Sequence, residues 1–349
     1  MACSNTPAKL DTTLASVPAA NEAARCTIEG GQEANMEIRG KESLQQGGEP
    51  PDVYPVPPLA RKRDSRRSLD FVQNERILRH LQKHGITNVV YGGNAFLYHV
   101  TLSEYHELLE WAGGFTREFS IVPAVGPSYG RAMDQAPLVR RHRFRSVLVL
   151  PCSDPRDAAG LETGLREIAE ACGVPLSVYI KHEADFGPDR DAGLDAVGRL
   201  VDGKVCGSIK YAVVRKDPKE DAYLASLLRR VPADRVISGI GERPAIVHLR
   251  DFKLNGFTTG SGVLAPRLSL DLLNACARKD YAAAEEIRRA FLPLEDLRDA
   301  WGAAPVLHAS VEAAGLAETG SVPPFVSPVP ALQVEQLRPI ARALLERNG

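Results

Sequence analysis

The sequence has 349 residues, of which 44% are hydrophobic and 25% are charged, and its formal net charge is −1. This composition is typical of a globular protein, and the nearly balanced charge gives no electrostatic reason to expect nucleic acid or an anionic membrane as a partner. No apolar run approaches the roughly 18 residues of a membrane span, and the N-terminus lacks the apolar core of a secretory signal, so we expect a cytoplasmic protein.

The chain changes character near residue 50. Residues 1–50 are rich in small and polar residues without sustained apolar periodicity, which predicts a disordered N-terminal extension. Beyond them, short apolar runs alternate with amphipathic segments. The apolar runs, which we interpret as strands, cover residues 52–59, 87–94, 119–126, 146–152, 175–181, 206–214, 235–241 and 256–262. Helical patterns follow them at residues 69–84, 101–112, 133–142, 160–172, 190–201, 219–231, 243–253 and 267–279.

This regular alternation predicts a parallel sheet. Eight strand–helix units over residues 51–279 match a closed (β/α)₈ TIM barrel, which typically needs about 250 residues. A doubly wound open sheet would require a glycine-rich phosphate turn after the first strand, and "VPPLARKRDS" is not one. Further helical stretches at 280–292, 294–302, 308–316 and 331–347 predict a C-terminal helical appendage over residues 280–349.

A lysine stands inside the predicted sixth strand, "CGSIKYAV". In a barrel, strand side chains alternate between the lumen and the helix layer. Ile209 and Tyr211 suit the helix layer, so Lys210 faces the lumen between the small residues Ser208 and Ala212. The same alternation in the fifth strand, "PLSVYIK", turns Tyr179 inward. Because adjacent strands lie about 4.8 Å apart, the phenol and the amine can approach each other.

This pair has a chemical use. A lysine attacks a ketone only when it is neutral, and burial in an apolar lumen lowers its pKa from about 10.4. The neutral amine can form a Schiff base, which acts as an electron sink for breaking or making a carbon–carbon bond, and a nearby tyrosine hydroxyl can relay protons. The alternative is that Lys210 is a structural lysine in a salt bridge at a strand end.

Metal-dependent chemistry is not expected. The eight histidines show no HxH or HExxH spacing, and no cysteine pair has CxxC spacing. We therefore expect neither a metal nor an organic cofactor, and we expect the six cysteines to be free thiols, as in a reducing cytoplasm.

With these motifs in place, residues 52–316 resemble the dihydrodipicolinate synthase / N-acetylneuraminate lyase family of pyruvate-dependent class I aldolases. "GSIKYA" resembles the family's Schiff-base strand, with Lys210 as the lysine, and "PLSVYIK" resembles its tyrosine-bearing strand, with Tyr179 as the catalytic tyrosine. "YGGNAFLYHVTLSEYHELL" resembles the second strand and the carboxylate-binding turn, and "RVISGIGE" and "NGFTTGSGVLAP" resemble the seventh and eighth strands.

The sequence departs from the family at several positions. The family turn usually reads GTTGE, but Gly93 and Asn94 stand here at its two threonines, so the relay hydroxyl is missing. Cys152 and Ser153 stand where the synthases have a pair of tyrosines, and no arginine follows the catalytic tyrosine. These departures argue against true dihydrodipicolinate synthase activity, although they leave the Schiff-base residues in place.

The hypothesis is a Schiff-base-forming lyase or aldolase that acts on a pyruvate-type 2-keto acid. Its catalytic residues would be Lys210 and Tyr179, and the resemblance implies a homo-oligomer, either a dimer or a tetramer. The residues expected to bind the substrate are Gly93, Asn94, Lys181, Gly239, Thr258 and Thr259. Two alternatives remain open: a keto-deoxy sugar acid dehydratase with the same Schiff base, and a non-catalytic ligand-binding or regulatory barrel.

Overall fold

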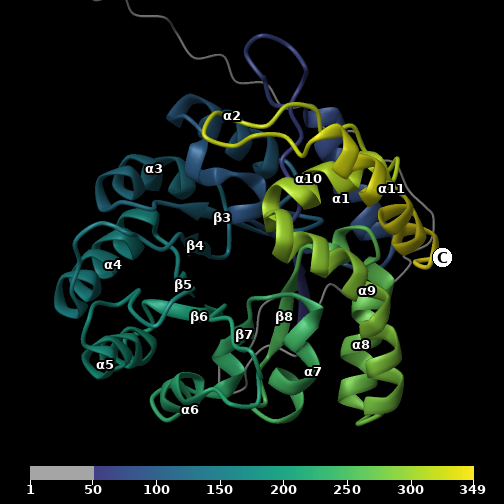
Figure 1. Cartoon of the computed structure of the whole chain (residues 1–349). Helices are drawn as coiled ribbons and strands as arrows, with labels where there is room; N and C mark the ends of the chain where they lie inside the picture. The colour runs from purple at the N-terminus through teal and green to yellow at the C-terminus, as the bar shows by residue number, and fades with distance from the viewer. Residues whose placement is uncertain (1–50) are drawn as a thin grey trace, which may run out of the picture. The chain divides into compact units, whose positions relative to one another are not determined.

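The structure, a computed structural model of the chain, describes residues 51–349 (Figure 1). The extension expected over residues 1–50 lies outside the described residues. None of the helices in the described part combines the length and the apolar character that a bilayer crossing requires.

Eight short parallel strands form the centre of this part. Their bounds are β1 (Asp52–Pro55), β2 (Asn88–Tyr91), β3 (Ser120–Val125), β4 (Val147–Val149), β5 (Leu176–Ile180), β6 (Cys206–Tyr211), β7 (Val236–Ser238) and β8 (Gly256–Thr259). The hydrogen-bonded order is β1-β8-β7-β6-β5-β4-β3-β2. Side chains bridge the remaining seam between β1 and β2, where the Asn88 amide donates to the Asp52 carboxylate. The predicted (β/α)₈ TIM barrel is therefore confirmed.

A helix follows each strand, and these helices surround the strands in Figure 1. Their bounds are α1 (Phe71–Lys83), α2 (Leu102–Gly113), α3 (Tyr129–Arg141), α4 (Ala158–Cys172), α5 (Arg190–Asp202), α6 (Ala222–Leu228), α7 (Glu242–Arg250) and α8 (Pro266–Ala277). Several begin at caps that the sequence supplies. The Asp157 and Asp189 side chains accept hydrogen bonds at the starts of α4 and α5, and Thr101 with Glu104 forms a capping box on α2.

Three more helices follow the barrel: α9 (Tyr281–Trp301), α10 (Ala303–Ala313) and α11 (Ala331–Glu346). The sequence predicted a break at Pro293, but α9 continues through it. A proline removes one helical hydrogen bond, and here the buried residues Phe291 and Leu294 hold α9 against its neighbours on both sides of the proline. Helix α10 packs against the turn η1 (Gly93–Ala95), which follows β2.

The strands are shorter than the sequence predicted. The sixth run was expected to extend over residues 206–214, but β6 ends at Tyr211. Ala212 and Val213 lie beyond the strand and are nevertheless buried. Hydrophobicity therefore overestimates the strand, because it reports burial and not hydrogen-bonded pairing.

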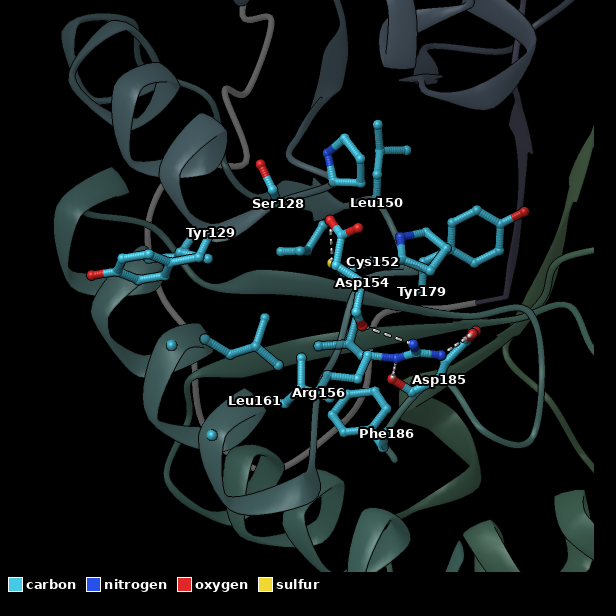
Figure 2. Close-up of a pocket in the computed structure, with 18 of the residues that line it drawn as sticks. Ser128, Tyr129, Leu150, Cys152, Asp154, Arg156, Leu161, Tyr179, Asp185 and Phe186 are labelled. Carbon is cyan, nitrogen blue, oxygen red and sulfur yellow. Dashed lines mark hydrogen bonds and ion pairs between the residues drawn. The ribbon is translucent and has the colours of Figure 1, made fainter. Parts of the chain in front are cut away.

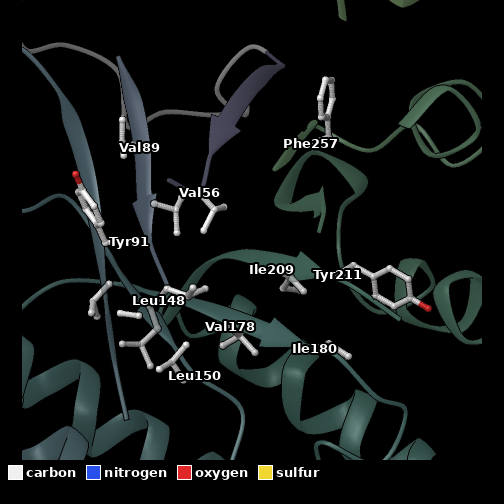
Figure 3. Packing of buried hydrophobic residues seen from close by; sticks show 14 of the residues in the cluster. Val56, Val89, Tyr91, Leu148, Leu150, Val178, Ile180, Ile209, Tyr211 and Phe257 are labelled. Carbon is white, nitrogen blue, oxygen red and sulfur yellow. The ribbon is translucent and has the colours of Figure 1, made fainter. Parts of the chain in front are cut away.

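The core between the strands and the helices fixes which way each strand residue faces (Figure 3). Tyr211 faces the helix layer, since its hydroxyl donates to Asp221 at 2.8 Å and its ring lies 6.3 Å from that of His248 on α7. Ser238 on β7 faces the same layer, because its hydroxyl is hydrogen-bonded to His248. By alternation, Lys210 and its register partner Ile237 face the lumen.

Candidate active site

Lys210 lies on β6 in the barrel lumen, opposite Tyr179 on β5. Its side chain is 7% exposed, and its Nζ lies 4.4 Å from the centroid of the Tyr179 ring. Within residues 51–349, no carboxylate forms an ion pair with this amine and no hydrogen bond holds it. A structural lysine in a salt bridge would have such a partner, so the surroundings are those of a buried amine without a counter-charge.

This environment favours the neutral amine. Burial, together with the nearby cations of Arg298 and Lys181, lowers the pKa of Lys210 to about 8. An amine with a pKa near 8 is about one-tenth neutral at pH 7, whereas an ordinary lysine is neutral in only about three molecules in ten thousand. The site therefore holds a nucleophile that can attack a carbonyl carbon near neutral pH.

Tyr179 keeps its phenolic proton. Burial raises the pKa of its hydroxyl, and Tyr98 and Asp185 add to the effect. The hydroxyl forms no hydrogen bond with another residue of the described part, and in Figure 2 it points away from the cavity beside its ring. A phenol in this state can donate a proton to a group bound beside Lys210.

Gly239 supports the lysine from β7. Its backbone N–H donates to the Tyr211 carbonyl at 2.6 Å. A Cβ at Gly239 would lie 2.7 Å from that oxygen and 3.0 Å from Cγ of Lys210. Only glycine therefore allows the end of β7 to approach β6 this closely.

The two threonines of β8 face opposite ways. Phe257 pairs with Ser238, which faces the helix layer, so Thr258 faces the lumen. Thr258 has no side-chain hydrogen bond to another described residue. The Thr259 hydroxyl instead accepts from the Gly262 N–H at 2.7 Å and is hydrogen-bonded to the Glu242 carboxyl. Only Thr258 is thus placed beside the Lys210 layer with its hydroxyl available.

The remaining predicted residues lie around the mouth of the barrel. Gly93 and Asn94 form the turn after β2, and the Asn94 amide donates to the Val56 carbonyl at 2.9 Å across the seam between β1 and β2. The side chain of Lys181, at the end of β5, is exposed. Its backbone N–H donates to the Asp185 carboxylate at 2.6 Å.

Tyr98 belongs to this site although the sequence reasoning did not select it. It lies in the turn η2 (Leu97–His99), and a Cβ on Gly93 would lie 3.8 Å from its ring. Burial and Asp185 raise the pKa of its hydroxyl to about 12. The structure therefore places a phenol beside the turn in which Gly93 and Asn94 leave the threonine hydroxyl absent. Its only sequence signal is its place in "YGGNAFLYHV".

A buried ionic network next to β7 and β8 was also missed. Arg298 on α9 donates to Glu295 at 2.7 Å, and Ser261 donates to the same carboxylate. Glu242, fully buried at the start of α7, accepts from the Ser269 hydroxyl at 2.7 Å. Burial and the Glu295 carboxylate raise the pKa of Glu242 to about 7. The network brings the Arg298 cation close enough to lower the pKa of Lys210.

A cavity of 510 Å³ opens beside Tyr179, between the starts of α3 and α4 and the end of β5 (Figure 2). The loop after β4 forms one side and contributes Cys152 and Asp154 to the lining; Cys152 is one of the two residues that the sequence comparison placed at the family's tyrosine positions. Arg156 ties this loop to the loop after β5 by donating from Nε to the Asp185 carbonyl at 2.9 Å and from Nη2 to the Ala184 carbonyl at 3.0 Å.

No group of three or more His, Cys, Asp or Glu side chains in residues 51–349 is arranged to hold a metal ion.

The fold is shared with solved structures of dihydrodipicolinate synthases and their relatives. The synthase of Bacillus clausii matches with 22% identity and a TM-score of 0.70, covering 84% of this chain and 96% of that chain. YagE, a prophage protein of Escherichia coli K12 from the same family, solved in complex with pyruvate, matches with 18% identity and a TM-score of 0.72, covering 84% and 98%.

A third match is the 4-hydroxy-tetrahydrodipicolinate synthase of Methylacidiphilum fumariolicum SolV, with 18% identity and a TM-score of 0.71, covering 86% of this chain and 97% of that chain. No model of a known protein family matches the sequence, and no curated protein matches it. At these identities the likeness shows the fold.

Proposed function

We propose that this chain is a divergent member of the dihydrodipicolinate synthase / N-acetylneuraminate lyase family, and that it is a Schiff-base-forming lyase or aldolase acting on a pyruvate-type 2-keto acid. The observation that carries the proposal is the buried Lys210 amine, which has a lowered pKa and no counter-ion within residues 51–349 and lies 4.4 Å from the Tyr179 ring in the lumen of the barrel. Active sites of (β/α)₈ barrels lie at the carboxyl ends of the strands, where both residues stand.

The reaction begins with the neutral Nζ of Lys210. Its lone pair attacks the ketone carbon of the keto acid, and Tyr179 donates its proton to the hydroxyl that leaves the carbinolamine as water. The product is an iminium ion. In a 4-hydroxy-2-keto acid, the deprotonated Tyr179 then takes the proton of the C4 hydroxyl and the electron pair of the C3–C4 bond moves into the iminium, so this bond breaks and an aldehyde and an enamine result. Protonation of the enamine carbon and hydrolysis of the imine release pyruvate and restore the amine.

The other residues of the mouth bind the substrate in this proposal. The Thr258 hydroxyl and the backbone N–H groups of the Gly93–Asn94 turn hold the keto-acid carboxylate. Gly239 positions Lys210, and the exposed Lys181 contributes positive charge at the entrance. Tyr98 lies beside Gly93 and near Tyr179, so its phenol can relay protons between Tyr179 and the mouth of the barrel.

The residues at positions 93, 94, 152 and 153 favour a substrate other than that of the dihydrodipicolinate synthases. A keto-deoxy sugar acid dehydratase would use the same imine, and product analysis separates it from an aldolase. Assembly as a homodimer or homotetramer is part of the proposal.

Borohydride trapping tests the proposal. The wild-type protein is incubated with pyruvate and sodium borohydride, and intact mass and peptide mapping locate the reduced adduct. We expect one adduct, on Lys210, which is absent from Lys210→Met and retained in Lys216→Met, a change at an exposed lysine. If no keto acid gives an adduct while ligand binding is measurable, the non-catalytic binding barrel is the better description.

A further inference from the structure

We propose that the cavity beside Tyr179 binds an uncharged, apolar group, and that in the proposed reaction this group is the substituent carried by the aldehyde half of the substrate. The second part rests on the proposed function. The cavity itself is defined by the loops after β3, β4 and β5 and by helix α4.

The position of the cavity connects it to the reactive amine. Tyr179 is part of the cavity lining, and its ring lies 4.4 Å from Nζ of Lys210. A substrate joined to Lys210 as an imine therefore needs to extend only past one aromatic ring to enter the cavity. The carbon chain beyond the bond that breaks is the part of the substrate that would extend this way.

The size of the cavity suits a substituent larger than pyruvate. Its 510 Å³ lies within the roughly 300–1,000 Å³ of small-molecule pockets. It equals the volume of about 17 water molecules at roughly 30 Å³ each. A three-carbon keto acid would leave most of this space unfilled, so the cavity is adapted to a second, bulkier part of the substrate.

The walls of the cavity are mainly apolar. Helix α4 contributes one side, the strands β4 and β5 contribute the floor, and the loop after β5 contributes an aromatic ring. The residues are Leu161, Leu165, Ile168, Val149, Val178 and Phe186. A branched or aromatic hydrocarbon group gains stabilisation by leaving water for such walls.

The charges around the cavity disfavour an anionic group. Among the residues that the structure describes, Arg156 is the only cation of the lining, and its guanidinium is already hydrogen-bonded. Besides its two bonds to the loop after β5, its Nη1 donates to the Asp154 carbonyl at 3.1 Å. Three carboxylates, those of Asp154, Asp157 and Asp185, belong to the same lining. A second carboxylate on the substrate would therefore meet negative charge and find no free cation.

Two independent measurements test the inference. Binding is measured by ligand-observed NMR with benzyl alcohol, an unreactive, uncharged probe. Turnover is measured as condensation of pyruvate with benzaldehyde and, separately, with glyoxylate, which carries a carboxylate. Leu161→Trp fills the cavity from α4, and Leu332→Trp is the matched control, since Leu332 is 81% exposed on α11.

A second filling variant is Gly164→Leu, in case Leu161→Trp does not fold. Its Cβ would lie 3.4 Å from the half-exposed Tyr129 ring, an ordinary contact, and leucine favours a helix more than glycine does. Circular dichroism and thermal unfolding show whether each variant is folded.

We expect the wild-type protein and Leu332→Trp to bind benzyl alcohol and to prefer benzaldehyde over glyoxylate by at least about tenfold in kcat/KM. The folded filling variants should lose at least about tenfold in both measurements. If benzyl alcohol binds both folded filling variants as well as it binds wild type, or if the wild-type protein prefers glyoxylate, the inference is overturned. If pyruvate gives no adduct on Lys210 but benzyl alcohol still binds and the filling variants abolish this, the lyase proposal fails and the apolar site stands.

Discussion

Replacing Lys210 with methionine should make the protein more stable at neutral pH. The pKa of this amine falls from 10.5 to about 8, chiefly through burial. At 1.36 kcal/mol for each pKa unit, the protonated amine destabilises the folded state by about 3 kcal/mol. Methionine has a similar length and no charge, so Lys210→Met removes this cost while filling the same space.

The stability that Lys210→Met gains over wild type should depend on pH in a defined way. Below about pH 8 the amine is protonated in both the folded and the unfolded state, so the full cost is present. Between about pH 8 and pH 10.5 the folded protein loses the proton first, and the cost shrinks; above pH 10.5 it is gone. The advantage of Lys210→Met should therefore be largest near pH 7 and small at pH 10.5.

Thermal unfolding of the two proteins at pH 7 and at pH 10.5 measures this difference. We expect the midpoint of Lys210→Met to rise by roughly 5–10 °C at pH 7. The control Lys216→Met changes an exposed lysine and should leave the midpoint nearly unchanged. A Lys210→Met protein that is less stable at pH 7, or equally stabilised at both pH values, would show that a partner holds the amine and would refute the reasoning.

Three further changes test other parts of the site. Tyr179→Phe keeps the ring and removes the phenolic proton, so the rate of imine formation and the turnover should both fall by about 10²–10⁴-fold, while the adduct on Lys210 still accumulates during prolonged trapping because the amine is unchanged; absence of the adduct after prolonged trapping contradicts this. The free energy of unfolding of Glu242→Gln should rise relative to that of wild type by up to about 3 kcal/mol as the pH increases from about 4.5 to about 7, because the carboxyl ionises in the unfolded wild type before it ionises in the folded one. Urea unfolding at pH 5 and pH 8 measures this difference, and an equal difference at both pH values would refute the prediction. Gly239→Ala should destabilise by about 2 kcal/mol, because its Cβ would lie 2.7 Å from a carbonyl oxygen of β6, whereas Gly130→Ala, with open space on α3, should not; comparable unfolding midpoints for the two would show that β7 can move away.

The fold could be predicted from the sequence because its signals are local. The alternation of a strand-like and a helix-like segment repeats eight times along residues 51–279, and it identifies the barrel without knowledge of any contact. The predicted ends were less accurate. At 206–214 the strand pairing ended before the buried run did, and at Pro293 the contacts of buried residues on both sides of the proline kept α9 continuous.

The alternation of side chains along β5 and β6 is also local, and it brought Tyr179 and Lys210 together in the prediction before their contact was known. What the sequence could not show is the environment of these residues. Arg298 reaches the site from α9, Glu242 and Glu295 share one buried network, and the cavity beside Tyr179 is the space left between loops and a helix from different parts of the chain. The sequence by itself determined the fold and the candidate nucleophile, since both follow from short-range periodicity. Only the tertiary structure decided the charge around that nucleophile and the space beside it, because desolvation and cavity volume arise from side chains that are far apart in the sequence.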